Sequence, residues 1–433
     1  MSLFGTSGIR AVFDHNLLAT AFRVGLAVGR NHNNVVVGTD TRTSGDAMKH
    51  AVISGLLAAG ARCSDAGIVP TPTLAFITRE FDVGVMITAS HNPPEYNGIK
   101  LLNPDGSSFD SLQQAQVEEA ISDESFEVTR WEDIKHGGAY DGAIDNHIES
   151  ILPGFPTDLN IKVVVDAGCG AASEVTPRLL ERLGCEVVSL NCYPSGFFPR
   201  GIEPTEANLQ DLCRAVRESG ADVGIAHDGD ADRMMAVDDR GRFVSGDRLL
   251  AVLAKGLGAK EVVTTLDASM AIEEMGFSIR RTKIGDTWVS EELRKGGDFG
   301  GETSGAWIFP VISLCPDGIY AAAQVAALAS RQKLSELVDA VPVYPLLRGS
   351  IGSNGLTMSR LESNLMKLSP LSVNNADGFK LNFKDGWLLI RASGTEPKVR
   401  LTAEAKTEER AQQLYDSGLA AVRDSVDTGG RAK

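Results

Sequence analysis

A unit of strand, turn, helix, glycine and second strand recurs along this chain, and it constrains the fold more than any other feature. The first copy has a β-branched strand at 35–37, a polar turn at 40–44 and a predicted helix over 45–59. Gly60 stands where a helix C-cap is expected, and a second strand follows at 61–64. Connections of this length favour parallel neighbouring strands. The unit therefore predicts α/β architecture.

Two further copies span 162–190 and 261–282, and the last has a helix predicted over 268–275. Three copies predict three α/β domains of related build, because 433 residues are too many for a single core. The turn 166–173 in the second copy suggests a dinucleotide-binding loop, but it lacks the third glycine of that motif. A tight turn between strand and helix is the preferred interpretation.

The composition argues against several classes of binding partner. The formal net charge is −15 and there is no basic run, which argues against nucleic-acid binding. The six cysteines are scattered without a Cys-x-x-Cys pair, which predicts free thiols in a reducing compartment and no zinc site. The first residues do not resemble a signal peptide, and no apolar stretch approaches the length of a membrane span. We therefore expect a cytoplasmic protein without a membrane partner.

A buried strand predicted at 83–87 ends at a short loop, Thr88–Pro93. Two consecutive prolines hold this loop in one shape. The loop offers Ser90 and His91, and Lys100 follows in the next strand. These groups suit nucleophilic chemistry, although a capped turn between two strands is an equally good interpretation of the loop alone.

A second strand, predicted at 221–227, runs directly into three alternate acids, Asp228, Asp230 and Asp232. Alternate carboxylates on a loop suit a hard cation with oxygen ligands. An EF-hand is excluded because Arg233 stands where that loop needs glycine, and a strand follows instead of a helix. The alternative is a solvated acidic turn.

Two later loops offer further polar chemistry. Residues 300–305 combine glycines with one acid and two hydroxyls, which suits sugar hydroxyls, although a plain turn is a fair alternative. Residues 391–400 combine two arginines, a lysine, two hydroxyls and glycine-exposed amides. These groups suit a phosphate dianion, so a phosphate-binding loop is the preferred interpretation and a charged hairpin is the alternative. If the four loops meet at the carboxyl ends of strands in one cleft, they form a phosphoryl-transfer site.

In this order the loops resemble those of the α-D-phosphohexomutase superfamily. Thr88–Pro93 resembles its phosphoserine loop, Asp228–Arg233 its metal loop, Gly301–Gly305 its sugar loop and Arg391–Pro397 its phosphate loop. The motifs reach from Gly5 to Arg400, so the resemblance covers nearly the whole chain. It implies a heart-shaped α/β protein with a central cleft, in which three related mixed α/β domains precede a smaller C-terminal α+β domain. The expected domains are 1–150, 151–245, 246–342 and 343–433.

The resemblance also implies roles for individual residues. Ser90 would be phosphorylated, and one Mg²⁺ would be held by the Ser90 phosphate with Asp228, Asp230 and Asp232. Arg10, His91 and Lys100 would neutralise charge or move protons. The residues expected to bind the substrate are Arg233, Lys283, Gly285, Asp286, Glu302, Ser304, Arg391, Ser393, Gly394, Thr395 and Arg400.

The implied reaction moves a phosphoryl group between O6 and O1 of a hexose phosphate through a 1,6-bisphosphate. The segment Lys283–Asp286 and the first residues, Phe4–Arg10, resemble the phosphoglucosamine mutase branch, so we expect glucosamine 6-phosphate and glucosamine 1-phosphate as substrate and product. A phosphoglucomutase/phosphomannomutase, a metal-dependent phosphatase and a non-catalytic sugar-phosphate sensor are the alternatives. Many members carry histidine where this chain has Ala306. The expected protein is a monomer or homodimer.

Overall fold

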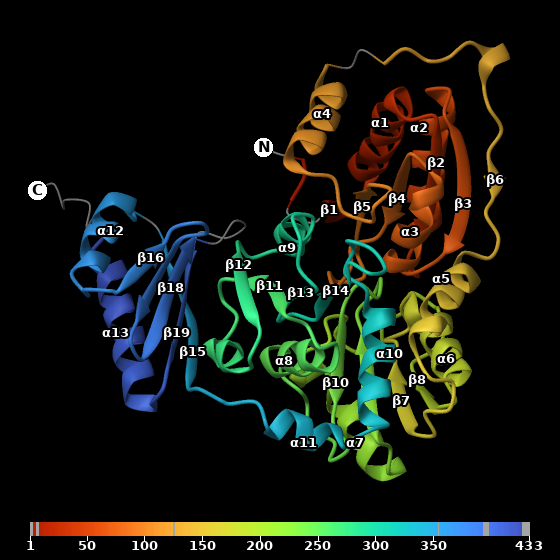
Figure 1. Cartoon of the computed structure of the whole chain (residues 1–433). Helices are drawn as coiled ribbons and strands as arrows, with labels where there is room; N and C mark the ends of the chain where they lie inside the picture. The colour runs from red at the N-terminus through yellow and green to blue at the C-terminus, as the bar shows by residue number, and fades with distance from the viewer. Residues whose placement is uncertain (1–2, 6–7, 124–125, 354, 393–397, 427–433) are drawn as a thin grey trace, which may run out of the picture. The chain divides into compact units, whose positions relative to one another are not determined.

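The computed structural model describes residues 3–5, 8–123, 126–353, 355–392 and 398–426. The chain divides into two compact bodies. The first body contains residues 1–263 and 285–340, and the second contains residues 264–284 and 341–433. Each body is described separately below (Figure 1). None of the described helices combines the length and apolar composition that crossing a bilayer requires.

The first body begins with a six-stranded mixed sheet whose central strands are buried on both faces. Val35 and Val37 of β2 pack into one core with helices α1 and α2, whereas Val36 packs into another core with α3. Alternate side chains of a strand point to opposite faces, so this valine run needs helices on both sides. In order across the sheet, its strands are β1 (Ile9–Val12), β5 (Tyr96–Leu102), β4 (Val83–Ile87), β2 (Asn34–Thr39), β3 (Arg62–Ile68) and β6 (Gly138–Ala139).

The two other sheets of this body repeat the pattern with fewer strands. The second sheet has the order β10 (Met234–Val237), β9 (Val223–His227), β7 (Lys162–Asp166) and β8 (Glu186–Leu190). The third contributes β11 (Glu261–Thr265), β13 (Phe299–Glu302) and β14 (Ala306–Ile308) in this order. The strand pairs β2–β3 and β7–β8, which flank the predicted crossover helices, are parallel, so that expectation is confirmed.

The α-helices of the first body cover these sheets (Figure 1). They are α1 (His15–Asn31), α2 (Gly45–Ala58), α3 (Thr71–Ile77), α4 (Ser111–Ser122), α5 (Ala143–Ile151), α6 (Ala172–Arg182), α7 (Gln210–Ser219), α8 (Gly246–Gly256), α9 (Asp286–Leu293), α10 (Gly318–Ala329) and α11 (Leu334–Asp339). Short 3₁₀ helices are η1 (Thr78–Glu80), η2 (Trp131–Asp133), η3 (Leu152–Gly154) and η4 (Glu206–Leu209). Gly60 has a φ of +86°, the left-handed conformation expected just after the end of α2.

The third copy of the repeated unit differs from the prediction. The helix expected over 268–275 is instead the 3₁₀ helix η5 (Met270–Glu274). The Ser269 side chain accepts a hydrogen bond from the backbone N–H of Ala271, so the helix begins late, and Gly276, with a φ of +91°, follows its end as predicted. The few residues that remain are too short for a stable α-helix. This segment, with β12 (Ser278–Thr282), belongs to the second body.

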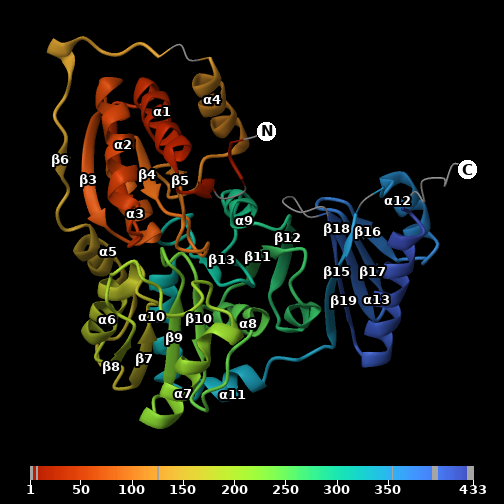
Figure 2. The same ribbon diagram turned by 180° about the vertical axis from the view of Figure 1, so that it is seen from behind.

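The rest of the second body is a five-stranded antiparallel sheet. Its order is β15 (Leu346–Gly352), β19 (Lys398–Ala405), β18 (Gly386–Ala392), β17 (Phe379–Phe383) and β16 (Ser372–Asn374). Helices α12 (Met358–Met366) and α13 (Glu408–Arg423) cover one face, as both views show (Figures 1 and 2). Their apolar residues share a core with Leu388, Ile390 and Leu401 of the sheet. The antiparallel sheet with helices on one side confirms the expected α+β class.

Candidate active site

Ser90 lies at the carboxyl end of β4, where the chain leaves the first sheet. Its φ of +50° is in the left-handed region that non-glycine residues seldom adopt, and its backbone N–H donates to Thr88 Oγ1 at 2.8 Å. The residue is 1% exposed, and its hydroxyl donates to Asp228 Oδ2 at 2.7 Å. The loop therefore presents the Ser90 hydroxyl to a carboxylate that is 138 positions away in the sequence.

Arg42 holds the Ser90 loop in this shape. Its guanidinium donates to the backbone carbonyl oxygens of Ser90, Asn92, Pro93 and Tyr96 at 2.6–2.9 Å. Its Nε pairs with Asp40 Oδ2 at 3.2 Å, and both side chains of this pair are fully buried. A guanidinium has five N–H groups in a planar fork, so one side chain can bind several carbonyls at defined angles. Arg42 is thus a positioning residue that the sequence analysis did not single out.

We predict that Arg42→Met lowers turnover by about 100-fold and destabilises the protein by about 3–5 kcal/mol. The change frees the four loop carbonyls and leaves Asp40 buried without its cation. Urea unfolding and steady-state kinetics would measure the two effects, with Arg62→Met, at an exposed arginine, as the matched control. Normal turnover in a folded Arg42→Met variant would contradict the positioning role.

Asp228, Asp230 and Asp232 form a compact, buried carboxylate cluster. One oxygen from each lies within 4.8 Å of the others. Asp230 Oδ2 accepts from Thr71 Oγ1 and Lys100 Nζ, whereas Asp230 Oδ1 is buried without a hydrogen-bond partner among the described residues. A buried carboxylate oxygen without a donor is unfavourable in the protein alone, and a hard cation would satisfy it. The donor set therefore fits Mg²⁺.

Gly229 allows the acid loop to approach the serine loop closely. A Cβ at this position would lie 2.7 Å from the backbone oxygen of Ser90, which is closer than real side chains come. Any other residue at position 229 would push the two loops apart and lengthen the contact between Ser90 and Asp228.

The charged groups of the cluster shift one another's pKa values. Burial, together with the charges of Asp232 and Asp230, raises the pKa of Asp228 well above its ordinary value. Burial alone would also raise the pKa of Asp230, but the ammonium of Lys100 outweighs it and lowers that pKa. Lys100 Nζ lies 2.7 Å from Asp230 and 2.5 Å from Asp232. Although burial opposes its charge, these carboxylates raise the pKa of Lys100, which therefore supplies positive charge and not a base.

His91 and Arg10 approach the serine from the other side. His91 Nδ1 lies 3.3 Å from Ser90 Oγ. Burial, with the nearby charges of Arg233 and Arg10, lowers the pKa of His91 to about 3, so the imidazole is neutral at physiological pH and is a weak base. Arg10 Nη1 donates to Asn92 Oδ1 at 3.1 Å, and its Nε is buried without a partner among the described residues.

The candidate sugar loop, residues 302–305, joins β13 and β14. It lies against the metal loop, since the backbone N–H of Met234 donates to the Gly305 oxygen at 3.0 Å. Ser304 Oγ is buried and has no partner among the described residues, so it can bind a ligand hydroxyl. Ala306, at the position of the missing histidine, is buried in β14 and forms a backbone bridge with Arg233.

Asp286 begins α9 of the first body, and Gly285 precedes it with a φ of +136°. The charge of Asp286 contributes to the raised pKa of Asp232, after burial and the charge of Asp230, so Asp286 lies near enough to the carboxylate cluster to act on it electrostatically. Lys283, the other polar residue of this segment, belongs to the second body.

The second body carries a separate group of cations. Arg348, Arg391 and Arg400 line a cavity of about 450 Å³ on the sheet. Arg391 lies directly opposite Arg400 in the antiparallel register, and its Nε pairs with Asp377 at 2.9 Å. Like charges at directly opposed positions repel, so an anion would stabilise this arrangement. Arg348 was not singled out from the sequence. Three predicted residues, Ser393, Gly394 and Thr395, lie outside the described part of the chain.

Four family models match the chain in succession. Phosphoglucomutase/phosphomannomutase domains I, II and III, described as alpha/beta/alpha, match residues 1–128, 145–241 and 245–344. The C-terminal domain of the same family matches residues 356–419. Together these models match well over half of the chain.

Curated relatives match over the full length. A probable phosphoglucosamine mutase of Methanocella arvoryzae is 47% identical, over 99% of both chains. A phosphoglucosamine mutase of Methanococcus maripaludis is 41% identical, over 98% of this chain and 99% of the relative.

Solved structures share the fold. A phosphoglucomutase/phosphomannomutase family protein of Burkholderia thailandensis has a TM-score of 0.85 at 29% identity, covering 98% of this chain and 97% of the other. The N-acetylphosphoglucosamine mutase of Aspergillus fumigatus, in complex with GlcNAc-6P and magnesium, has a TM-score of 0.62 at 16% identity, covering 98% and 96%.

Proposed function

Since this chain belongs to the α-D-phosphohexomutase superfamily, we propose that it moves a phosphoryl group between O6 and O1 of glucosamine phosphate. The observation that carries this proposal is the hydrogen bond from Ser90 Oγ to Asp228 Oδ2, because it joins the candidate nucleophile to the candidate metal site. The full-length likeness to phosphoglucosamine mutases supports the choice of sugar.

Asp228, Asp230 and Asp232 would hold Mg²⁺ together with a phosphate on Ser90, since their donor set fits a hard cation. When bound, the ion would neutralise charge on the transferred phosphoryl group. The chain's own cations would add to this effect. Lys100 supplies a buried ammonium, and Arg10 brings an unpartnered buried N–H to the same loop.

Proton transfer at Ser90 has two candidate acceptors. When the second phosphoryl group returns to Ser90, the hydroxyl proton can pass to Asp228 Oδ2, which already accepts it as a hydrogen bond. The neutral imidazole of His91, 3.3 Å from Ser90 Oγ, is the other acceptor within reach, but its lowered pKa makes it the weaker base.

The phosphate that is not transferred would bind to the arginines of the second body. Arg391 and Arg400, with Ser393, Gly394 and Thr395 of the adjoining loop, would hold either phosphate of the 1,6-bisphosphate in turn. Arg348, on the same cavity, adds a third forked donor. Glu302 and Ser304 would bind sugar hydroxyls.

We predict that kcat/KM for glucosamine 6-phosphate exceeds that for glucose 6-phosphate and mannose 6-phosphate by at least about tenfold. The physical reason is the carboxylate of Asp286, which would pair with the C2 ammonium of glucosamine, and charge-assisted hydrogen bonds discriminate by about this much. Asp286→Asn should therefore reduce kcat/KM for glucosamine 6-phosphate about tenfold and leave kcat/KM for glucose 6-phosphate and mannose 6-phosphate nearly unchanged.

Purified protein with Mg²⁺ and the matching 1,6-bisphosphate would test this choice. A preference for a neutral sugar would favour the phosphoglucomutase/phosphomannomutase alternative. Release of inorganic phosphate without a sugar 1-phosphate would indicate a phosphatase, and binding without turnover would indicate a sensor.

A further inference from the structure

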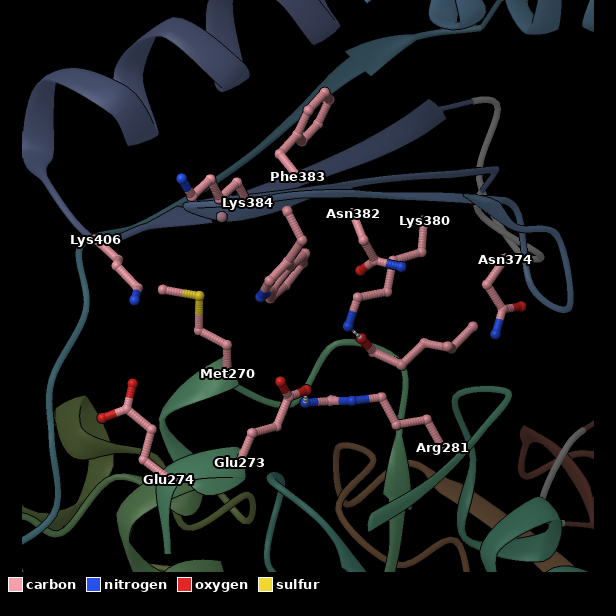
Figure 3. A pocket seen from close by; sticks show the side chains of 13 residues that line it. Met270, Glu273, Glu274, Arg281, Asn374, Lys380, Asn382, Phe383, Lys384 and Lys406 are labelled. Carbon is pink, nitrogen blue, oxygen red and sulfur yellow. Dashed lines mark hydrogen bonds and ion pairs between the residues drawn. The ribbon is translucent and has the colours of Figure 1, made fainter. Parts of the chain in front are cut away.

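A second cavity lies entirely within the second body, away from the residues discussed so far. It measures about 460 Å³ and lies between the segment of η5 and β12 and the ends of β17 and β18 (Figure 3). None of the predicted site residues lines it. Its walls combine apolar side chains, including Met270 and Trp387, with several charged ones.

The acids of this cavity are already engaged. Glu273 pairs with Arg281 at 2.9 Å, and Arg281 also donates to three backbone carbonyls of 265–269. Glu274 accepts a hydrogen bond from the Tyr344 hydroxyl. The ion pair of Glu273 and Arg281 is drawn at the base of the cavity in Figure 3. Glu274 receives only a neutral donor and keeps its charge, so four cationic side chains (Arg281, Lys380, Lys384 and Lys406) and two carboxylates line the cavity, which leaves an excess of positive charge.

Lys380 is the most unusual of the remaining cations. It is only 3% exposed, and its ammonium donates to the backbone oxygen of Leu266 at 2.6 Å and lies 4.4 Å from the Trp387 ring centroid. The buried acid nearby, Glu404, accepts hydrogen bonds from the Ser269 hydroxyl, the backbone N–H of Met270 and the Trp387 indole. Burial, with the charge of Arg281, lowers the pKa of Lys380 to about 7. A buried ammonium without a carboxylate partner is unfavourable, and an anion in the cavity would relieve this.

Two further lysines, Lys384 and Lys406, line the same cavity and are exposed. No hydrogen bond or ion pair with another described residue engages either ammonium. Together with Lys380 they bring three lysine side chains to the lining of one cavity in a chain with a net charge of −15. Such a local excess of unpaired cations is typical of an anion-binding site.

We propose that this cavity binds a small organic phosphate, with its phosphate groups on Lys380, Lys384 and Lys406 and its apolar part against Met270 and Trp387. The volume suits a ligand larger than a free inorganic ion. Asn382, which also lines the cavity, uses one amide N–H to donate to Ser372 Oγ at 3.1 Å, and its second N–H is a further donor. The site is distinct from the arginine cavity of the same body, which shares none of its lining residues.

Isothermal calorimetry with inorganic pyrophosphate as the probe, in Mg²⁺-free buffer, tests the proposal. The double variant Arg391→Ala/Arg400→Ala removes the arginine site and should still bind pyrophosphate. Adding Lys384→Ser and Lys406→Ser should weaken that binding at least tenfold, as should adding Lys380→Met. Lys367→Ser, at an exposed lysine of the same body, is the matched control and should change nothing. Citrate should bind at least tenfold more weakly than pyrophosphate.

Loss of all pyrophosphate binding in the Arg391→Ala/Arg400→Ala variant would overturn the proposal, as would unchanged binding after the three lysine substitutions. Equal binding of citrate would overturn the assignment to phosphates. Thermal unfolding checks that each variant is folded. The Lys384→Ser/Lys406→Ser variant should have the mutase activity of the wild-type protein. The binding experiment therefore tests the anion site separately from the proposed catalytic function.

Discussion

Replacing Ser90 with alanine should reduce mutase activity by at least roughly 10³-fold and abolish the phosphorylation that we expect on the purified protein. The hydroxyl that donates to Asp228 is the atom proposed to carry the phosphoryl group, and alanine has no group that can replace it. The fold should survive, because the lost side chain is small, and alanine keeps the strained backbone at a penalty of about 1–2 kcal/mol.

Intact-mass spectrometry and a coupled activity assay would measure both effects. Ser90→Gly provides a second variant, because glycine adopts a positive φ freely. It removes the hydroxyl without adding backbone strain, so its activity reports the loss of the hydroxyl alone. Ser122→Ala, at an exposed serine of the same body, is the control and should keep both phosphate and activity. Activity that persists in both Ser90 variants would contradict the role of this hydroxyl.

The second large effect is expected for Asp228→Asn. This change should lower kcat by roughly 10³-fold and abolish the stabilisation of the protein by Mg²⁺. In the metal-free state, however, the variant should be at least as stable as the wild-type protein. The reason is that burial, together with repulsion from Asp232 and Asp230, raises the pKa of Asp228, and a neutral amide of the same shape removes both penalties.

Thermal unfolding with and without Mg²⁺ would separate these effects. A ligand at 100 times its dissociation constant stabilises the folded state by about 2.7 kcal/mol, which gives a clear shift in Tm for the unmodified protein. Asp141→Asn, at an exposed aspartate, should keep that shift and full activity. An Mg²⁺ shift that is unchanged in Asp228→Asn would show that the ion binds elsewhere.

Much of the fold could be predicted from local patterns. The β-branched runs of β2 and β7, the glycine after each following helix and the apolar run of β4 were all recognised, because such patterns act within a few residues. The prediction failed at η5, where a capping serine delays the start of the helix and leaves only a short 3₁₀ helix before the expected glycine. In the C-terminal domain the sequence analysis did not locate β15, β16, β17 or α12.

The chemistry of each candidate loop was also readable from its own residues. Three alternate acids after a buried strand indicate a hard-cation site wherever the strand lies, and Ser90 stood out because a rigid loop presents it. The roles of Arg42 and Lys380 could not be found in this way. An arginine in a polar turn and a lysine in a strand look ordinary until their partners are known, and those partners are distant in the sequence.

The sequence by itself determined the strands of the repeated units and the side chains that each candidate loop offers, since these depend on neighbours in the chain. Only the tertiary structure decided that Ser90 Oγ lies 2.7 Å from Asp228 and that Lys100 joins Asp230 to Asp232. These contacts join different sheets of the first body, and they depend on how side chains pack across more than a hundred intervening residues. No local pattern encodes that packing, because the approach of two loops is set by every layer of the core between them.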